Sequence, residues 1–331
     1  MSHNTTLKKI SQILDISIST VSRALKNHPD ISEKTKQKVV ELAATLDYEP
    51  NANAINLRTN NSKIFALIVP SISYYFYDTF ISSIEEECRK NGYSLMILQS
   101  GDEIETELSN IKLCRHNRVT GVFACITPNT IDITPFLKLE DADIPLIFFD
   151  KVPAYEACNK ICMADAHAAK MAAELIVQKQ KKKVVGFFGN KSLSITQKRL
   201  PAFTEFFQQT HTSTKLETDF ALSFEEAYEK TIRYLSAKNA PDTIFCMSDE
   251  ILTGVMKAIL QLQVKIPQDI AVVALSNGII PKIYYPQITY VETSGYKLGK
   301  LAFTRMMACL EDSTFTEELT IESILVEGGS I

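Results

Sequence analysis

From about residue 62 onward, short runs rich in Val, Ile and Phe alternate with stretches of helical periodicity. The apolar runs are KIFALIVP, SLMILQS, GVFACI and IPLIFFD, and, after about residue 160, VVGFFG, TIFCMS and IAVVAL. Helices are expected between them, at 78–91, 103–116, 166–179, 196–209, 224–237 and 250–262. A strand that is apolar throughout must be covered on both faces, so this alternation predicts parallel sheets flanked by helices. The two runs of strands predict two α/β lobes.

The first 60 residues contain helical patterns only. Thr6 and Ser32 can cap two of these helices, and apolar residues recur at helical spacing on each of the three expected helices. The apolar positions are Leu7, Ile10 and Leu14; Val21, Ala24 and Leu25; and Val39, Ala43 and Leu46. The segment EPNANAINLRTNNS follows, in which Pro50 can open a short helix before a polar linker.

Charge and cysteine content narrow the class of protein. The chain of 331 residues has a formal net charge of -4. Its first 60 residues carry eight Lys and Arg against six acids, so the amino-terminal part is the basic part. Seven scattered cysteines predict reduced thiols rather than disulfides. Neither a signal peptide nor an apolar run of about 20 residues is present in this sequence, so we expect a cytoplasmic protein without a membrane span.

The stretch SISTVSRALKN, residues 17–27, places short hydroxyl side chains at the front of a helix. In a helix-turn-helix, the second helix enters the major groove by its amino-terminal end. Ile18, Ser19 and Ser22 fall on the side away from the apolar face, where hydroxyls reach phosphates or base edges. Arg23 can offer its guanidinium to guanine N7 and O6. The residues alone leave open a second interpretation, an ordinary capped helix in a small bundle.

Residues 6–59 resemble the LacI/GalR family of bacterial transcription repressors. The pattern S-x-S-T-V-S-R-A-L…S-x-x-T-x-x-x-V…L-x-Y-x-P-N-x-x-A-x-x-L-R carries the resemblance. NSKIFALIVPSIS, KRLPAF, CMSDEILTG and VKIPQDIAVVAL extend it into a core similar to periplasmic sugar-binding proteins. The resemblance implies a helix-turn-helix domain at 1–50, a hinge helix and linker at 51–61, and a two-lobed ligand-binding and dimerisation domain at 62–331. The first lobe is expected at about 62–155 plus 292–318, and the second at about 156–291 plus 319–331.

By this resemblance, the head binds double-stranded, pseudo-palindromic operator DNA. Leu57 matches the hinge leucine that wedges into the central base step of the minor groove. One departure is Asp15, which stands where the family usually has a glycine in the turn between the first two helices; Asp tolerates a left-handed backbone, so the turn should survive. The residues expected to bind DNA are Thr6, Ser17, Ile18, Ser19, Thr20, Ser22, Arg23, Asn27, Ser32, Asn51, Ala54, Leu57 and Arg58.

The aromatic-rich stretch SISYYFYDTF follows the first strand, at the sheet edge where open α/β folds bind ligands. Arg199 matches the arginine that family members use on ligand hydroxyls or carboxylates. Asp249 is expected to cap the helix behind it. The residues expected to bind ligand are Ser71, Phe76, Tyr77, Asp165, Ser194, Arg199, Ser248, Ser276 and Thr293.

Two of these positions depart from the family. Many sugar-binding relatives carry an Asp where this chain has Ser276, and the glutamine usual near the last crossover is replaced around Thr293. Without the carboxylate of that Asp, the ligand would lose a charge-assisted hydrogen bond, which argues against a simple hexose as the ligand. A carbohydrate or its phosphorylated derivative is still the leading expectation, and a nucleoside or purine is the alternative.

We therefore predict a ligand-responsive transcription repressor that acts as a homodimer. The loop GIIPKIYYP and helix 78–91 are candidate dimer contacts. A binding protein of the periplasmic type, without a DNA function, is the competing class. No enzyme, cofactor or metal is expected, since the sequence has no Gly-rich phosphate loop and its five histidines show no metal-ligand spacing. Cys158 and Cys162 form no ligand pair that we can assign.

Overall fold

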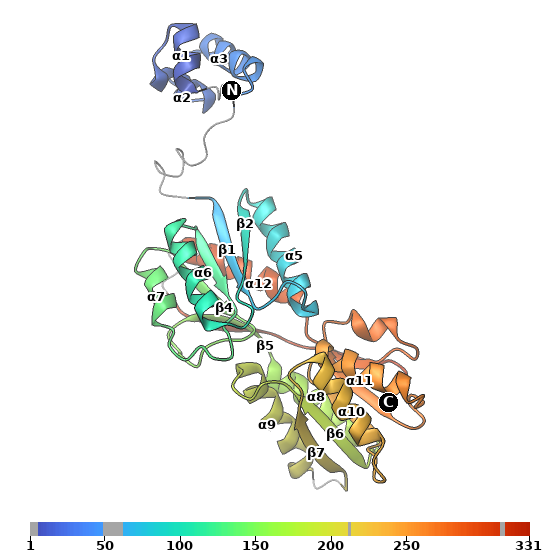
Figure 1. The fold of residues 1–331 in the computed structure, drawn as a ribbon. Coiled ribbons are helices and arrows are strands. Elements are labelled where there is room, and N and C mark those ends of the chain that lie inside the picture. Colours follow the sequence, from blue (N-terminus) through green and yellow to red (C-terminus); the bar gives the residue numbers. More distant parts are fainter. Residues whose placement is uncertain (1–5, 49–61, 211–212, 312–314) are drawn as a thin grey trace. The chain divides into compact units, whose positions relative to one another are not determined.

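The computed structural model describes residues 6–48, 62–210, 213–311 and 315–331 (Figure 1). The chain divides into two compact units, Met1–Ser62 and Lys63–Ile331. Each unit has its own hydrophobic core, and each is described by itself below.

In residues 6–48, the first unit is a head made of three helices, α1 (Leu7–Leu14), α2 (Ile18–Leu25) and α3 (Glu33–Thr45). Hydroxyl side chains cap all three helices: Thr6 accepts from Lys9 N, Ser17 from Thr20 N and Ser32 from Thr35 N. The buried core of the head consists of Ile10, Val21, Ala24, Val39 and Ala43. The predicted helices and their inward-facing residues are confirmed.

Asp15 takes the left-handed conformation that the turn after α1 requires, with φ 50° and ψ 47°. Its backbone N–H donates to the carbonyl of Ser11, which closes the helix end. The turn therefore accommodates Asp in place of the expected glycine, as the sequence predicted.

The second unit contains two six-stranded sheets, one in each lobe. The first sheet is parallel and has the order β11-β5-β4-β3-β1-β2. Helices α5 and α12 pack on one face of this sheet, and α6 and α7 on the other (Figure 1). The elements of this lobe are β1 (Ile64–Val69), α5 (Tyr75–Lys90), β2 (Ser94–Gln99), α6 (Ile104–His116), β3 (Gly121–Ala124), α7 (Thr134–Glu140), β4 (Leu146–Phe149), β5 (Asn159–Met163), α12 (Gly295–Leu310) and β11 (Glu318–Ile321).

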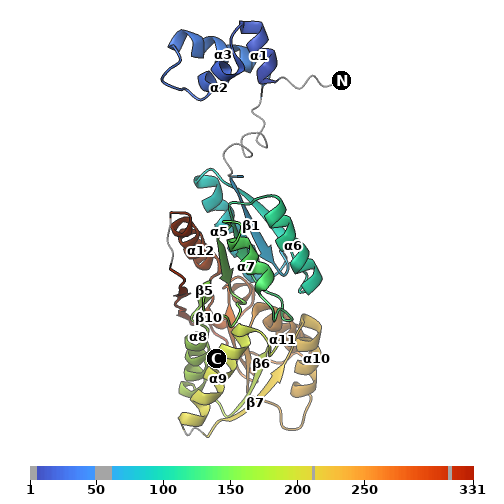
Figure 2. The ribbon, with the colours of Figure 1, turned by 90° about the vertical axis from the view of Figure 1, so that its left-hand side faces the viewer.

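The second sheet has the order β12-β10-β9-β8-β6-β7, with β12 antiparallel to β10 at one edge and the other pairs parallel. Helix α8 packs against α9, and α10 packs against α11 (Figure 2). The elements of this lobe are α8 (Asp165–Gln178), β6 (Lys183–Phe188), α9 (Ser194–Gln209), β7 (Lys215–Phe220), α10 (Phe224–Leu235), β8 (Thr243–Cys246), α11 (Asp249–Gln261), β9 (Ala271–Ser276), the 3₁₀ turn η1 (Ile280–Ile283), β10 (Thr289–Glu292) and β12 (Leu325–Val326).

The lobe boundaries differ from those expected at two crossovers. Strand β5, assigned by the sequence to the second lobe, pairs with β4 in the first sheet. Strand β11 reaches Ile321, beyond the expected end at 318, and pairs with β5. Strand β5 does not read as an apolar run because it begins with the polar residues Asn159 and Lys160, although both are buried. Their polar groups have partners from segments distant in the chain, because Asn159 Oδ1 accepts from Arg305 Nε at 2.9 Å and Lys160 Nζ lies 3.9 Å from Glu318.

Helix α5 begins at Tyr75, three residues before the expected start at 78. The aromatic run therefore forms the N-cap and first turn of α5, which follows β1 after a short loop. None of the helices in the described residues combines the length and the apolar composition that a membrane span requires.

Candidate functional site

The exposed face of α2 collects the head residues best placed to contact DNA. Ile18 is 47% exposed although it is a large apolar side chain, and Ser19 and Arg23 are exposed beside it. Ser22 and Thr20 are half-buried on the same helix. An exposed isoleucine beside hydroxyls and a guanidinium can offer both apolar and hydrogen-bonding contacts to base edges.

The capping hydroxyls of the head are also tied to one another. Ser17 Oγ lies 2.7 Å from Ser19 Oγ and 2.8 Å from Thr20 Oγ1, and Ser32 Oγ lies 2.8 Å from Thr35 Oγ1. In the structure, these predicted DNA-binding hydroxyls hold helix ends. Asn27 lies in the turn after α2 with a φ of 55°. Four further predicted DNA-binding residues, Asn51, Ala54, Leu57 and Arg58, lie outside the described residues.

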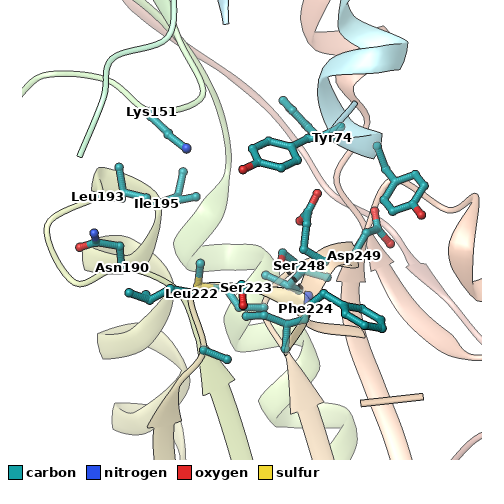
Figure 3. A pocket seen from close by; sticks show the side chains of 18 of the residues that line it. Tyr74, Lys151, Asn190, Leu193, Ile195, Leu222, Ser223, Phe224, Ser248 and Asp249 are labelled. Carbon is teal, nitrogen blue, oxygen red and sulfur yellow. Dashed lines mark hydrogen bonds between the residues drawn. The ribbon is translucent and has the colours of Figure 1, made fainter. Parts of the chain in front are cut away.

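A cavity of about 690 Å³ lies between the two lobes of the second unit. Tyr74, Tyr75, Phe76 and Tyr77 from the start of α5 form its wall on the first lobe. Figure 3 shows Tyr74 across the cavity from Ser223, Phe224 and Ser248, with Lys151 and Ile195 to one side. The second-lobe residues follow β6, β7 and β8, at the carboxyl ends of parallel strands, where open α/β sheets bind ligands.

Five of the nine predicted ligand-binding residues line this cavity: Phe76, Tyr77, Arg199, Ser248 and Thr293. The other four, Ser71, Asp165, Ser194 and Ser276, do not belong to its lining. Ser71 Oγ lies 2.8 Å from Ser73 Oγ in the loop before α5. Ser194 Oγ accepts from the backbone N–H of Val152 at 3.0 Å, and this bond joins the two lobes.

Arg199 is buried and its guanidinium is already occupied. Nε and Nη2 each lie 2.7 Å from Oδ1 of Asp165, and Nη1 donates to the carbonyl of Met247 at 3.0 Å. Burial raises the pKa of Asp165, and the positive charge of Arg199 opposes that rise. Asp165 thus lies behind Arg199, where it binds the arginine instead of facing the cavity.

Tyr77 has a similar internal role. It is buried and its hydroxyl donates to Asp150 Oδ2 at 2.6 Å. Burial and the adjacent Asp150 raise the pKa of Tyr77 well above its ordinary value. The ring lines the cavity, while the hydroxyl is bound by the end of β4.

Asp249 lies at the start of α11, but Ser248 is the residue that caps this helix. The expectation that Asp249 caps the helix is therefore wrong. The Asp249 carboxylate instead accepts from Ser276 Oγ and from the backbone N–H of Asn277 at 2.9 Å. Burial raises the pKa of Asp249 to about 6. Ser276, where an Asp was expected from the family, serves as a partner of this carboxyl.

Several cavity residues were missed because they are scattered along the chain. Lys151 follows β4, and its Nζ lies 3.5 Å from Asp102 Oδ1. Although burial lowers the pKa of Lys151, Cys125, Asp102 and Asp150 raise it on balance. The Asp150-Lys151 pair at the carboxyl end of an apolar strand was the signal available in the sequence.

Further hydrogen bonds join the lobes around the cavity. Ser192 Oγ donates to the carbonyl of Pro128 at 3.0 Å, and Asn277 Nδ2 donates to the carbonyl of Tyr75 at 2.8 Å. Thr79 Oγ1 donates to Asn277 Oδ1 at 3.3 Å. Among the described residues, no group of three or more His, Cys, Asp and Glu side chains is placed to hold a metal ion.

Family models match both parts of the chain. Residues 6–51 match the model described as "Bacterial regulatory proteins, lacI family", and residues 172–331 match "Periplasmic binding protein-like domain".

Similar proteins cover nearly the whole chain. The "NTD biosynthesis operon regulator NtdR" of Bacillus subtilis (strain 168) is 27% identical over 91% of this chain and 92% of its own length. The "HTH-type transcriptional repressor PurR" of Vibrio vulnificus (strain CMCP6) is 24% identical over 93% of this chain and 92% of its own length. A crystal structure of the lac repressor dimer bound to operator and the anti-inducer ONPF has a TM-score of 0.87 at 20% identity, over 98% of each chain. That similarity shows that the fold is shared.

Proposed function

Because this chain belongs to the lacI family of bacterial regulatory proteins, we propose that a small molecule bound between its two lobes sets its affinity for operator DNA. The family assignment makes the protein a DNA-binding transcriptional repressor. The proposal adds the control by ligand. Its main support is that one chain combines a helix-turn-helix head with a cavity of about 690 Å³ enclosed by two lobes.

The ligand proposed first is a carbohydrate or a sugar derivative. The three aromatic rings of Tyr74, Tyr75 and Phe76 give the cavity a wall on which a sugar ring can stack, and Asn190 and Ser248 add polar groups across it. This combination of an apolar wall and a few polar groups is typical of small-molecule sites. Arg199, Tyr77 and Ser276 already hold carboxylates of the protein, so ligand specificity depends on the remaining lining.

A nucleoside or purine is the second candidate. Aromatic rings stack on a base as readily as on a sugar. The match to repressors named PurR supports this alternative.

The proposal includes a homodimer in the cytoplasm. Two heads are needed to contact two half-sites of a pseudo-palindromic operator at once, since half-site spacing follows the symmetry of the protein. Residues 51–61, the proposed hinge, would then connect each head to its core.

Selection of bound sequences from a random DNA pool, followed by gel-shift titration, tests the DNA function. We expect a palindromic consensus bound by the full chain, and in the Arg23→Ala variant weaker binding with relaxed specificity at one position of each half-site. Enrichment of no sequence would contradict the proposal. Addition of sugars and nucleosides to the same gel shifts then tests control by ligand. A compound that changes the operator affinity must prefer one lobe arrangement over the other.

A further inference from the structure

The charged side chains that line the cavity are predominantly acidic. Seven residues with a formal charge at neutral pH contribute to the lining, five of them carboxylates and two of them cations. The carboxylates are Asp102, Asp150, Glu225, Asp249 and Glu250, and the cations are Lys151 and Arg199. A cleft with this balance attracts positive charge and repels negative charge, because low-dielectric walls strengthen both effects.

Both cations are matched by carboxylates of the protein itself. Arg199 pairs with Asp165, a residue behind the cavity, and also donates to the carbonyl of Met247. Lys151 lies 3.5 Å from Asp102 and follows Asp150 in the chain. An anionic ligand would have to take Lys151 away from Asp102 or Arg199 away from the buried Asp165, and breaking the buried pair costs more than breaking an exposed one.

The helix ends at the cavity are also poor sites for a phosphate. Helices α10 and α11 both begin there, and a helix N-terminus ordinarily favours an anion. Each already has a serine cap, and each carries two acids in its first turn: Glu225 and Glu226 in α10, Asp249 and Glu250 in α11. A phosphate would therefore meet carboxylates at both ends. The third such helix, α9, lines the cavity with the apolar side chains of Leu193 and Ile195.

The aromatic wall faces these carboxylates. Tyr74 is 38% exposed, so its ring is available to a ligand. Tyr74, Asp102 and Glu250 all line the cavity. Burial raises the pKa of Tyr74; the negative charges of Asp102 and Glu250 add to the rise, and the positive charge of Lys151 opposes it. A cation held between an aromatic face and a carboxylate is attracted by both. Glu250 is half-buried on α11, and in the described residues its carboxylate has no hydrogen-bond partner.

We infer that the ligand of this cavity carries a positive charge, and that it is an aminated carbohydrate whose ammonium group is bound between Tyr74 and Glu250. This inference rests on the proposed function, since it names the ligand class of the same site. The volume of about 690 Å³ falls within the range of pockets that enclose drug-sized molecules, so there is room for more than one sugar ring. A phosphorylated sugar, one of the two forms expected from the sequence, is disfavoured by the same charges.

Matched compounds test the charge while keeping the shape. The melting temperature of the full chain is measured with glucose, glucosamine, N-acetylglucosamine and glucose 6-phosphate, with the same set built on galactose, and with kanamycin against maltotriose. A compound that binds the folded state raises the melting temperature by mass action. We expect the amines to raise it, kanamycin most of all, and the neutral, acetylated and phosphorylated compounds to leave it unchanged.

The Glu250→Gln variant then assigns the contact. It removes the charge and keeps the size, so the affinity for the best amine, measured by calorimetry, should fall about tenfold, as expected for a hydrogen bond to a charged group. Glu229→Gln is the matched control, because Glu229 is an exposed acid on α10 that does not line the cavity. Its affinity should equal that of the unmodified chain.

Three results would overturn the inference: no response to any amine, a larger response to a neutral or phosphorylated compound than to its amine, or equal amine affinity in Glu250→Gln and the unmodified chain. A neutral or phosphorylated compound that binds leaves the proposed repressor function intact and changes only the ligand class. Failure of the repressor function is seen separately, as the absence of any preferred DNA sequence in the selection experiment.

Discussion

Arg199 on α9 holds Asp165 at the start of α8 through two contacts of 2.7 Å, from Nε and from Nη2, to one carboxylate oxygen. Both side chains are almost completely removed from solvent, at 6% and 2% exposure. Two residues expected separately to grip a ligand thus bind each other. The pair joins two neighbouring helices of the second lobe, and the arginine presents only part of its surface to the cavity.

Replacement of Arg199 by Met should therefore destabilise the protein. The change leaves the Asp165 carboxylate buried without its cation, and broken buried pairs of this kind cost about 3–5 kcal/mol. Urea denaturation of the core measures the loss. The double variant Arg199→Met, Asp165→Leu should recover most of it, since a buried pair replaced by apolar residues is often neutral. Unchanged stability in Arg199→Met would show that the arginine acts mainly on the ligand.

Asp249 should make the stability depend on pH. Burial raises its pKa in the folded protein to about 6, above the value in an unfolded chain, so the folded state binds this proton more tightly. Stability from this group is fully present below about pH 4 and is lost as the pH rises through about 6. The difference amounts to about 3 kcal/mol, from a shift of roughly two pKa units.

The Asp249→Asn variant checks this sign. The variant has no carboxyl to titrate at this position. As the pH rises from 4 to 6, its free energy of unfolding should therefore increase relative to that of the unmodified chain, as measured by urea denaturation. Glu229→Gln, an exposed acid on α10, is the control and should follow the unmodified chain at every pH. Parallel curves for Asp249→Asn and the unmodified chain would show that Asp249 does not titrate in this range.

The sequence predicted the parts of the fold that have a local pattern. The head helices, their caps and the apolar strands are such parts, because periodicity and capping residues act over a few positions. Strand β7, KLETDF, was missed because it lies at a sheet edge, where its residues are polar in the majority and each is exposed or half-buried. Strand β5 was missed because Asn159 and Lys160 are buried with partners from distant segments.

The cavity shows the same limit. Phe76 and Tyr77 were found because the aromatic run is local, and Arg199 was found through the family motif. The roles of Arg199 and Tyr77 were not predictable. Arg199 binds Asp165 and Tyr77 binds Asp150, and both carboxylates are distant in the chain from their partners. No pattern in one sequence shows which acids a fold brings to which cations.

Arg23 and Ser22 should differ in the way they act on DNA. Arg23 is exposed on α2 and is expected to read a base, so Arg23→Ala should cost about 1–3 kcal/mol and relax specificity at one position of each half-site. Ser22 is half-buried and is expected to bind phosphate, so Ser22→Ala should weaken binding to all sequences alike. Gel-shift titration on a library of operator variants separates the two effects. Equal loss on every sequence for Arg23→Ala would exclude base reading.

Leu57, outside the described residues, stays a prediction from the family resemblance. If its side chain wedges into the central base step, Leu57→Ala should keep the folded core and its ligand binding but lose most of the preference for operator over random DNA. Bending measured by circular-permutation gel shift should decrease as well. An unchanged bend angle would show that Leu57 is only part of a linker.

Asn277 should control the closure of the two lobes. It follows β9 in the second lobe, and its side chain donates to the carbonyl of Tyr75 at 2.8 Å and accepts from Thr79 Oγ1 at 3.3 Å, both on α5 of the first lobe. Asn277→Ala removes both bonds while the backbone N–H can still donate to Asp249. The closed arrangement then loses roughly 1–2 kcal/mol relative to the open one.

A ligand that bridges the lobes binds the closed arrangement, so its affinity for Asn277→Ala should fall by about tenfold. Small-angle scattering of the ligand-free variant should show a larger radius of gyration. Asn91→Ala is the matched control, since within the described residues its side chain donates to the carbonyl of Glu87 at the end of its own helix and makes no bond to the second lobe. If Asn277→Ala and the control have the same ligand affinity and the same radius of gyration, the two bonds of Asn277 do not stabilise the closed arrangement. Coupling between two binding sites is reciprocal. If Asn277→Ala lowers the ligand affinity by opening the lobes, the effect of that ligand on operator binding must therefore change as well.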